Sequence, residues 1–399
     1  GGGGGGGEDE GVFLTLLRMI FLKGPKAVLP WQTTRHQEIQ DYLARRDFGF
    51  YRFGSRPFWY RRVERKKVMY WGHQEKGEGR EGRGVCFWPD PPTGGGETYH
   101  GMWRAGWPHG HGVFRWYYGD MFLGEWKEGK QEGYGIYVYS AHGPHAGDRY
   151  EGSYHSNKRQ GTGVYRYAGE GGGVYIGEWM RGMMAGGGIM LYPDNEHYIG
   201  NWKNDLKHGL GIYVWGANAG VVANDKYEGN FQDGLAHGHG RTFFADGGWH
   251  KGRYAKGKMN GYGVMQTSEG FEYTGTWKDD ELHGEVLVQY LYGLNAAGTK
   301  EVQMYNMGDY IGERAYDSGK DWVGIESIGY GEARAGEGVG QDARKNMENV
   351  TAFARKAKMS QRLARDAADE AKYYAKASLT YKDYQEAWFG IKKYIWAEE

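Results

Sequence analysis

The sequence has one cysteine, few prolines and no hydrophobic run long enough to cross a membrane. Cys86 is the single cysteine among 399 residues, which excludes an internal disulfide and a cysteine-rich metal knuckle. The apolar stretch at residues 12–22 has eleven residues and contains Arg18, whereas a spanning helix needs about 20 apolar residues. We expect this stretch to pack against the repeats or a partner, or to lie in the plane of a membrane.

Net charge is also lacking. The 50 basic and 50 acidic residues cancel, so the overall charge predicts no nucleic-acid partner, and any electrostatic attraction must be local. Glycine is abundant, with 72 residues, and 16% of the chain is aromatic. Because disordered chains are poor in aromatic residues, this combination favours a packed fold in which glycine makes room for rings.

Glycines and rings recur in one pattern, aromatic-x-Gly-x-aromatic-x-x-Gly-x-x-x-Gly-x-Gly. Eight copies span residues 99–286 at intervals of 23 to 29 residues, and degenerate copies on either side extend the array to residues 70–314. Such a period is the signature of a repeat array with atypical terminal units. The residues that define the pattern include Tyr99, Gly101, Trp103, Phe122, Gly124, Trp126, Gly133, Gly135, Tyr150, Tyr175, Trp179, Tyr198, Trp202, Tyr227, Tyr273 and Trp277.

Each unit is predicted to be a β-hairpin. The first three pattern residues point to one face of a strand, where the bare glycine leaves room for a ring from the neighbouring strand. The turn position is always glycine, asparagine or aspartate, which tolerate a positive φ. Its occupants are Gly106, Gly129, Asn157, Gly182, Asp205, Gly234, Gly257 and Asp280. Hairpins joined edge to edge give a mainly β fold, an elongated, twisted, single-layer antiparallel ribbon.

Three intervals between units are longer than the rest. The extra residues lie near 141–149, 168–173 and 216–225, always in the connection between two units. Insertions in one type of connection decorate one edge of a repeat array. That edge is therefore a candidate for partner recognition.

The pattern, with its period near 23, closely resembles the MORN (membrane occupation and recognition nexus) repeat. The resemblance is strong over residues 99–286 and weaker over 70–314. It implies a twisted single-sheet ribbon used for protein scaffolding, membrane tethering or dimerisation, as in junctophilins, radial-spoke-head components of cilia and plastid-division factors. The sequence departs from the pattern at His250, which replaces the leading aromatic residue, and at Val286, which replaces the last glycine. We expect the array to weaken near Val286.

An N-terminal region, residues 1–69, precedes the array. Between residues 45 and 67 it carries nine basic and two acidic residues among many rings. A protein partner is favoured for this arm, with an anionic membrane surface or a solvated capping strand as alternatives. The candidate partner-binding residues are Arg56, Trp59, Arg61, Arg62, Arg65, Lys66 and Lys67.

A glycine-rich linker, residues 315–340, is predicted to separate the array from C-terminal helices at residues 341–399. In the first helix, residues 342–378, small apolar residues recur every three or four positions, typical of close helix packing. This row favours a partner helix, a homodimer seam, or packing back along the ribbon. A second helix, from Thr380, carries an aromatic and aliphatic stripe that needs a partner. Its candidate partner-binding residues are Tyr384, Trp388, Ile391 and Ile395.

No pattern of residues indicates catalysis, a cofactor or a metal. The sequence has no phosphate-binding loop, Gly-x-Ser-x-Gly elbow or His-Glu-x-x-His motif. The histidines at one repeat position, His109, His208, His237 and His283, are best explained by duplication of the repeat.

We therefore expect a non-enzymatic structural subunit of a large protein assembly. The resemblance favours a cytoskeletal or ciliary (axonemal) setting, although the chain does not begin with methionine, which leaves the compartment open. A membrane tether that binds anionic lipids through the basic arm, and a regulatory subunit of an enzyme in trans, are the competing functions. An organellar membrane-associated complex is the alternative location.

Overall fold

The computed structural model describes residues 68–75, 79–89, 96–169, 171–291, 298–316, 341–346 and 355–372. The chain divides into two compact units, one of residues 1–117 with 372–399 and one of residues 118–371. Each unit is described by itself. Most of the predicted linker, and the candidate residues of the N-terminal arm and of the stripe at 384–395, lie outside the described residues.

The first unit contains four strands that follow one another in chain order. They are β1 (Met69–Glu75), β2 (Gly79–Pro89), β3 (Gly96–Arg104) and β4 (Trp107–Arg115). Each pairs antiparallel with the next. Gly72 faces Gly84 across β1 and β2, so the degenerate N-terminal copy of the pattern forms a hairpin as its glycines predict.

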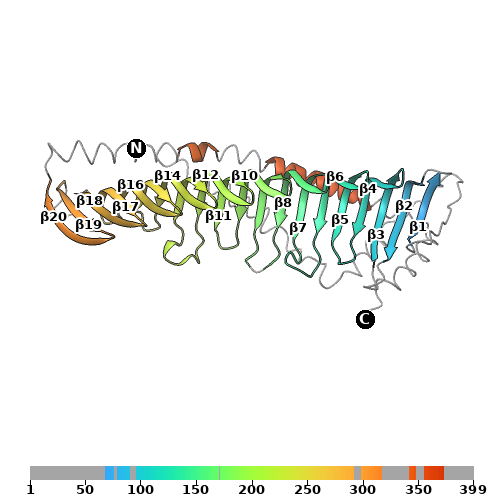
Figure 1. Ribbon diagram of the computed structural model, residues 1–399, viewed down its shortest axis with the longest axis horizontal. Coiled ribbons are helices and arrows are strands. Elements are labelled where there is room, and N and C mark those ends of the chain that lie inside the picture. Colours follow the sequence, from blue (N-terminus) through green and yellow to red (C-terminus); the bar gives the residue numbers. More distant parts are fainter. Residues whose placement is uncertain are drawn as a thin grey trace. The chain divides into compact units, whose positions relative to one another are not determined.

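The second unit has the same topology, with sixteen strands among its described residues, and each hairpin pairs with the next (Figure 1). The hairpins are β5 (Met121–Lys127) with β6 (Lys130–Val138), β7 (Arg149–His155) with β8 (Lys158–Arg166), β9 (Val174–Met180) with β10 (Met183–Leu191), β11 (His197–Lys203) with β12 (Leu206–Val214), β13 (Lys226–Gln232) with β14 (Leu235–Phe243), β15 (Trp249–Ala255) with β16 (Lys258–Gln266), β17 (Phe271–Lys278) with β18 (Glu281–Tyr290), and β19 (Lys300–Asn306) with β20 (Asp309–Ala315). The fold is mostly antiparallel β, an open sheet built of hairpins, as predicted.

Helix is a minor component of the second unit. Residues 341–346 and 355–372 are α-helical, within the part of the chain where the sequence predicts its first C-terminal helix, and η2 (Gly220–Val222) is a single 3-10 turn. No helix among the described residues is long and apolar enough to cross a membrane.

The turn position behaves as its composition predicts. Its eight occupants all have positive φ, from 65° at Asn157 to 93° at Gly182, and the residue before each also has positive φ. Two successive positive φ values define the type I′ turn, whose twist matches that of the flanking strands. Where the occupant is not glycine, its side chain also binds the backbone of the preceding hairpin. Asp205 accepts a hydrogen bond through Oδ1 from the backbone N–H of Met184 at 2.7 Å. Asn157 and Asp280 hold Gln131 and Met259 of the preceding hairpins in the same way.

The pattern glycines form a row across the second unit from Gly124 to Gly275. Gly200 faces Gly211 within one hairpin, and Gly211 faces Gly229 of the next. The leading ring lies over this row: a Cβ on Gly211 would lie 2.5 Å from Cε2 of Tyr198. The prediction that this ring comes from the neighbouring strand is right for Gly211 and wrong for Gly200, whose covering ring belongs to its own strand. The reason is that the ring lies along the strand and covers both glycines of the pair.

The rings themselves form a chain of edge-to-face contacts. Tyr198 meets Trp202 of its own strand at 5.2 Å between centroids and Phe231 of the next hairpin at 5.0 Å. The same two contacts recur from Phe122 to Trp277. The Tyr198 hydroxyl donates to the carbonyl of Asn201, 2.9 Å away, beside the irregularity in strand pairing that separates Gly200 from Trp202. Tyr150, Tyr175, Tyr198 and Tyr227 thus each join two hairpins and satisfy a backbone acceptor.

The predicted weakening near Val286 is correct for the glycine row and wrong for the sheet. Val286 is fully buried, and its Cγ2 lies 2.9 Å from where a Cβ of Gly275 would be. The space over the glycine pair is therefore filled, and Tyr273 is only half-buried, unlike Tyr198 and Tyr227. The sheet nevertheless continues through β19 and β20, because backbone pairing does not require the glycine row.

Candidate protein-interaction surfaces

Strand alternation gives the second unit an aromatic face, which carries the rings and the glycine row, and an aliphatic face on the opposite side. Buried residues of the aliphatic face include Ile176, Ile189, Ile199 and Ile212, each at most 1% exposed. They occupy the positions between pattern residues. The sheet therefore has two chemically distinct faces. Its strands end along two long sides, which we call the turn edge, formed by the type I′ turns, and the connection edge, formed by the connections between hairpins.

The C-terminal helical residues lie on the aliphatic face. Ala357, Ala364 and Ala371 are fully buried, and Gln361, which interrupts the row of small residues in the sequence, is 6% exposed. Ser360 hydrogen-bonds to Thr162, and the Asn346 amide donates to the carbonyl of Leu210. Of the three arrangements open for this row, the structure displays packing back along the ribbon. A homodimer through this helix stays a prediction, and it would require a surface other than these buried alanines or displacement of the helix.

Two buried carboxylates anchor these helical residues. Glu151 is 2% exposed and Glu228 is 1% exposed, and each occupies the position after a leading tyrosine. Nε of Arg365 lies 2.9 Å from Oε2 of Glu151, and Nη2 of Arg344 lies 3.1 Å from Oε1 of Glu228. Burial disfavours the charged form of Glu151, but Arg149 and Arg365 outweigh it and hold the pKa of this carboxyl below its usual value. The same repeat position thus receives an arginine in two different hairpins.

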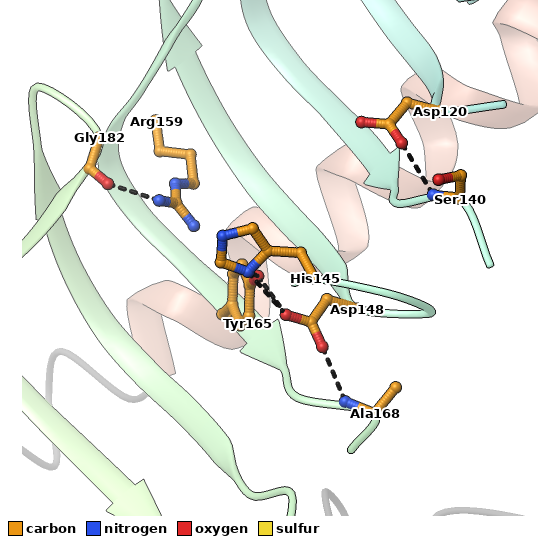
Figure 2. A network of polar contacts seen from close by, with 8 residues as sticks. All are labelled: Asp120, Ser140, His145, Asp148, Arg159, Tyr165, Ala168 and Gly182. Atoms are coloured by element: carbon orange, nitrogen blue, oxygen red, sulfur yellow. Dashed lines mark hydrogen bonds and ion pairs between the residues drawn. The ribbon is translucent and has the colours of Figure 1, made fainter. Parts of the chain in front are cut away.

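The connection edge is organised by aspartates that precede leading rings by two residues. Asp148 accepts hydrogen bonds from the Tyr165 hydroxyl at 2.6 Å and from the Ala168 N–H at 2.8 Å, and His145 lies 3.3 Å from the same carboxylate (Figure 2). Asp120 holds the Ser140 N–H in the same way, at 2.8 Å. Burial raises the pKa of the Tyr165 hydroxyl, and the hydrogen bond to the Asp148 carboxylate raises it further. These bonds fix the base of the inserted segments near 141–149 and 168–173, which lie at one edge as predicted.

Sequence reasoning missed these aspartates. The available signal was their constant spacing before Phe122, Tyr150 and Tyr227, where Asp225 likewise accepts from the Ala245 N–H at 2.9 Å. Nothing in the repeat pattern marks them, because several units carry a different residue there.

Two cations lie among rings on the aromatic face of the second unit. Arg159 lies 4.2 Å above the Trp179 ring centroid and donates to the Gly182 carbonyl at 2.6 Å, as Figure 2 shows for the latter contact. Lys207 occupies the equivalent position and lies 3.8 Å from the Tyr213 ring centroid, where burial lowers its pKa to about 8. Such contacts stabilise a cation that has lost part of its water. Both side chains reach the next hairpin, Arg159 at Trp179 and Gly182 and Lys207 at Phe231.

Within the described ranges, no group of three or more histidine, cysteine, aspartate and glutamate side chains is arranged to hold a metal ion. His250 and Tyr254 pack as a ring pair, with His250 Nδ1 2.7 Å from the Tyr254 hydroxyl. Burial lowers the pKa of His250 to about 3. This histidine therefore occupies the ring position of its repeat as a neutral side chain.

The comparison with protein families decides the identity of these hairpins. The MORN repeat model matches residues 78–90, 99–121, 122–143, 150–171, 175–197, 198–218, 227–249, 250–270 and 273–285. The chain is a MORN-repeat protein. The first match covers β2, and the others begin at the eight leading residues of the pattern. A search of curated proteins finds no match to this MORN-repeat chain.

Proposed function

We propose that this MORN-repeat protein is a non-enzymatic scaffold subunit of a large protein assembly. One observation carries the proposal: the aliphatic face holds helical residues through glutamates at the same position of two different repeats, Glu151 and Glu228. A surface that binds helix at repeated positions is suited to hold several protein segments in a fixed order. The chain of edge-to-face ring contacts makes the sheet a stiff support, because each hairpin is joined to its neighbours by side chains as well as by backbone hydrogen bonds.

The proposed setting is a cytoskeletal or ciliary assembly. The support is the family resemblance and the presence of several surfaces on one chain: the aliphatic face, the connection edge, and the basic and aromatic terminal segments. Candidate attachment residues at the termini are Arg61, Arg62, Trp59, Tyr384 and Trp388, which lie outside the described residues and whose partner-binding role is part of the proposal. MORN repeats are generally non-enzymatic, which agrees with the lack of catalytic motifs in the sequence.

Affinity purification of the full chain from its native source tests the scaffold proposal. We expect several proteins at constant stoichiometry after detergent treatment, since protein contacts survive the removal of lipid. A purified chain with no protein partner in stoichiometric amount would contradict the proposal. Assaying the recovered assembly with and without the chain separates a scaffold from a regulatory subunit, whose removal would change the activity of an assembled enzyme.

A membrane tether is the second candidate, favoured by the nine basic residues against two acidic ones between residues 45 and 67. Such a segment gains about 1 kcal/mol per basic residue at an anionic membrane surface. Flotation with phosphatidylserine vesicles, comparing the full chain with a chain lacking residues 11–67, discriminates the two. Binding that depends on this segment and falls with salt supports the tether; absence of binding at low salt leaves the scaffold.

A further inference from the structure

The turn edge of the second unit carries an apolar stripe. Met183, Leu206 and Leu235 each follow the turn residue of successive hairpins, and they are 36%, 47% and 50% exposed. Met180, at the end of β9, adds a fourth side chain at 51% exposure. We define these four residues as the tip stripe. In the other hairpins of this unit between residues 121 and 290 the same position holds a charged residue: Lys130, Lys158, Lys258 or Glu281.

The two leucines of the tip stripe each extend toward the next hairpin. A Cβ on Gly234 would lie 3.9 Å from Cδ2 of Leu206, and a Cβ on Gly257 would lie 3.6 Å from Cδ2 of Leu235. Each leucine therefore leans over the bare turn of the next hairpin, which leaves its outer surface open to solvent. The three exposed apolar side chains occupy the same position in successive repeats, whereas scattered surface residues of this kind need no explanation.

The spacing of the stripe matches a helix. Successive hairpins place equivalent tip residues about 9.6 Å apart, since each hairpin contributes two strands at about 4.8 Å. Seven residues of α-helix rise about 10.5 Å. A helix lying along the turn edge can therefore place an apolar residue at every heptad against each of Met183, Leu206 and Leu235.

The charges beside the stripe indicate the sign of the partner. Exposed basic residues at the turn edge from β5 to β16 are Lys127, Lys130, Lys158, Arg181, Lys203, Lys256 and Lys258; exposed acidic residues at the same positions are Glu128, Asp205 and Asp233. Asp205 already accepts a backbone hydrogen bond within the sheet. Within the stripe Arg181 and Lys203 balance Asp205 and Asp233, so the excess of positive charge lies in the flanking hairpins, where it favours a partner helix with acidic residues.

We infer that the tip stripe is a docking surface for an acidic amphipathic helix with apolar residues at heptad spacing. The surface is separate from the aliphatic face that carries the chain's own helical residues, so the inference can fail while the scaffold proposal stands. A membrane surface is the other occupant that apolar and basic residues attract, but a line of single side chains with acidic residues between them fits one helix better than a lipid plane.

The test measures binding of a synthetic peptide to the full chain by fluorescence anisotropy. The probe is a four-heptad helix with leucine at the a and d positions and glutamate at the flanking positions. Two control peptides are a scrambled sequence of the same composition and a version with lysine in place of glutamate. We expect binding of the glutamate peptide alone, weakened by added salt.

The variant Leu206→Lys with Leu235→Lys is expected to weaken binding at least tenfold. Ile311→Lys is the matched control, because Ile311 is 64% exposed on β20 and lies outside the stripe. Circular dichroism shows that the variants keep their strand content. No binding of the glutamate peptide, or equal binding by the double variant and the wild type, overturns the inference. A membrane would be the occupant if phosphatidylserine vesicles captured the wild type, did not capture a Leu206→Ser with Leu235→Ser variant, and the glutamate peptide did not bind. That result also overturns the inference.

Discussion

Substitution of Gly211 by alanine tests whether the glycines serve to seat rings. The backbone at Gly211 has no positive φ, so alanine is conformationally acceptable there, but its Cβ would lie 2.5 Å from the fully buried Tyr198 ring. The ring must shift by about 1 Å to reach ordinary contact distance. It then loses contact with Trp202 and Phe231, each worth about 1 kcal/mol, and the hydrogen bond to Asn201, worth about another 1 kcal/mol. We expect a cost of about 3 kcal/mol.

Gly257→Ala is the matched control, because Gly211 lacks space for a Cβ but has an ordinary backbone, whereas Gly257 has the space but a positive φ. Gly257 lies in a turn with φ of 87°, and its Cβ would meet nothing closer than Leu235 at 3.6 Å. Alanine there has room and pays only for the left-handed backbone, about 1 kcal/mol. The difference of about 2 kcal/mol corresponds to roughly thirtyfold in a local opening equilibrium.

Hydrogen exchange followed by mass spectrometry is the suitable assay, since a repeat array opens locally and exchange reports which hairpins lose protection. We expect Gly211→Ala to raise exchange across β11, β12 and β13, and Gly257→Ala to raise it less and only around its own turn. Equal losses of protection in the two variants, or a larger loss in Gly257→Ala, would refute the proposed role of the glycine row.

Three further outcomes follow from individual contacts. Trp126→Ala removes a ring that is 6% exposed and should cost about 3 kcal/mol by thermal unfolding, whereas Lys130→Ala on the exposed tip should change stability by less than about 0.5 kcal/mol; equal melting temperatures would contradict the ring chain. Burial lowers the folded-state pKa of His250 to about 3, below its unfolded value, so the unfolded state binds more protons and stability falls as pH drops from about 6.5 toward 3. The stability of His250→Tyr relative to the wild type should therefore be about 2 kcal/mol greater at pH 5 than at pH 7.5. The same relative stability at both pH values would contradict the buried, neutral state of His250. Arg365→Ala removes one of the two arginines at Glu151 and should raise exchange across residues 355–372 about tenfold, while Arg362→Ala, whose side chain is 79% exposed, should not. Unchanged exchange in Arg365→Ala would show that the ion pair with Glu151 does not anchor the helix.

The hairpins and turns could be predicted from the sequence, because a positive φ and a two-residue side-chain period restrict residue type strongly. Glycine, asparagine and aspartate at the turn position pointed directly to a positive-φ turn residue, whereas the positive φ of the residue before it, which makes the turn type I′, was not predicted. The second role of Asp205, as acceptor from the preceding hairpin, was not predictable, since it depends on how neighbouring hairpins are aligned. The ring of Tyr198 over its own strand was likewise hidden, because spacing indicates a face and not the direction in which a side chain lies.

The surfaces were less predictable than the fold. The row of small residues from Ala343 to Ala371 indicated a buried helix face but not what buries it, because alanine packs equally well against a helix or a sheet. Glu151 and Glu228 carried no signal, since other repeats hold leucine, isoleucine, lysine or threonine at that position. Recognition of these carboxylates required their arginine partners, which lie more than 100 residues away in the sequence.

Cross-linking of the native assembly tests the scaffold claim most directly. The chain offers exposed lysines in separate repeats, among them Lys130, Lys158, Lys203 and Lys258, so lysine-reactive cross-linking and mass spectrometry can locate partners along the array. A scaffold predicts different proteins cross-linked to different repeats, reproducibly and in the same order. Cross-links confined to the N-terminal arm, or none to any other protein, would contradict the claim that the MORN array holds an assembly together.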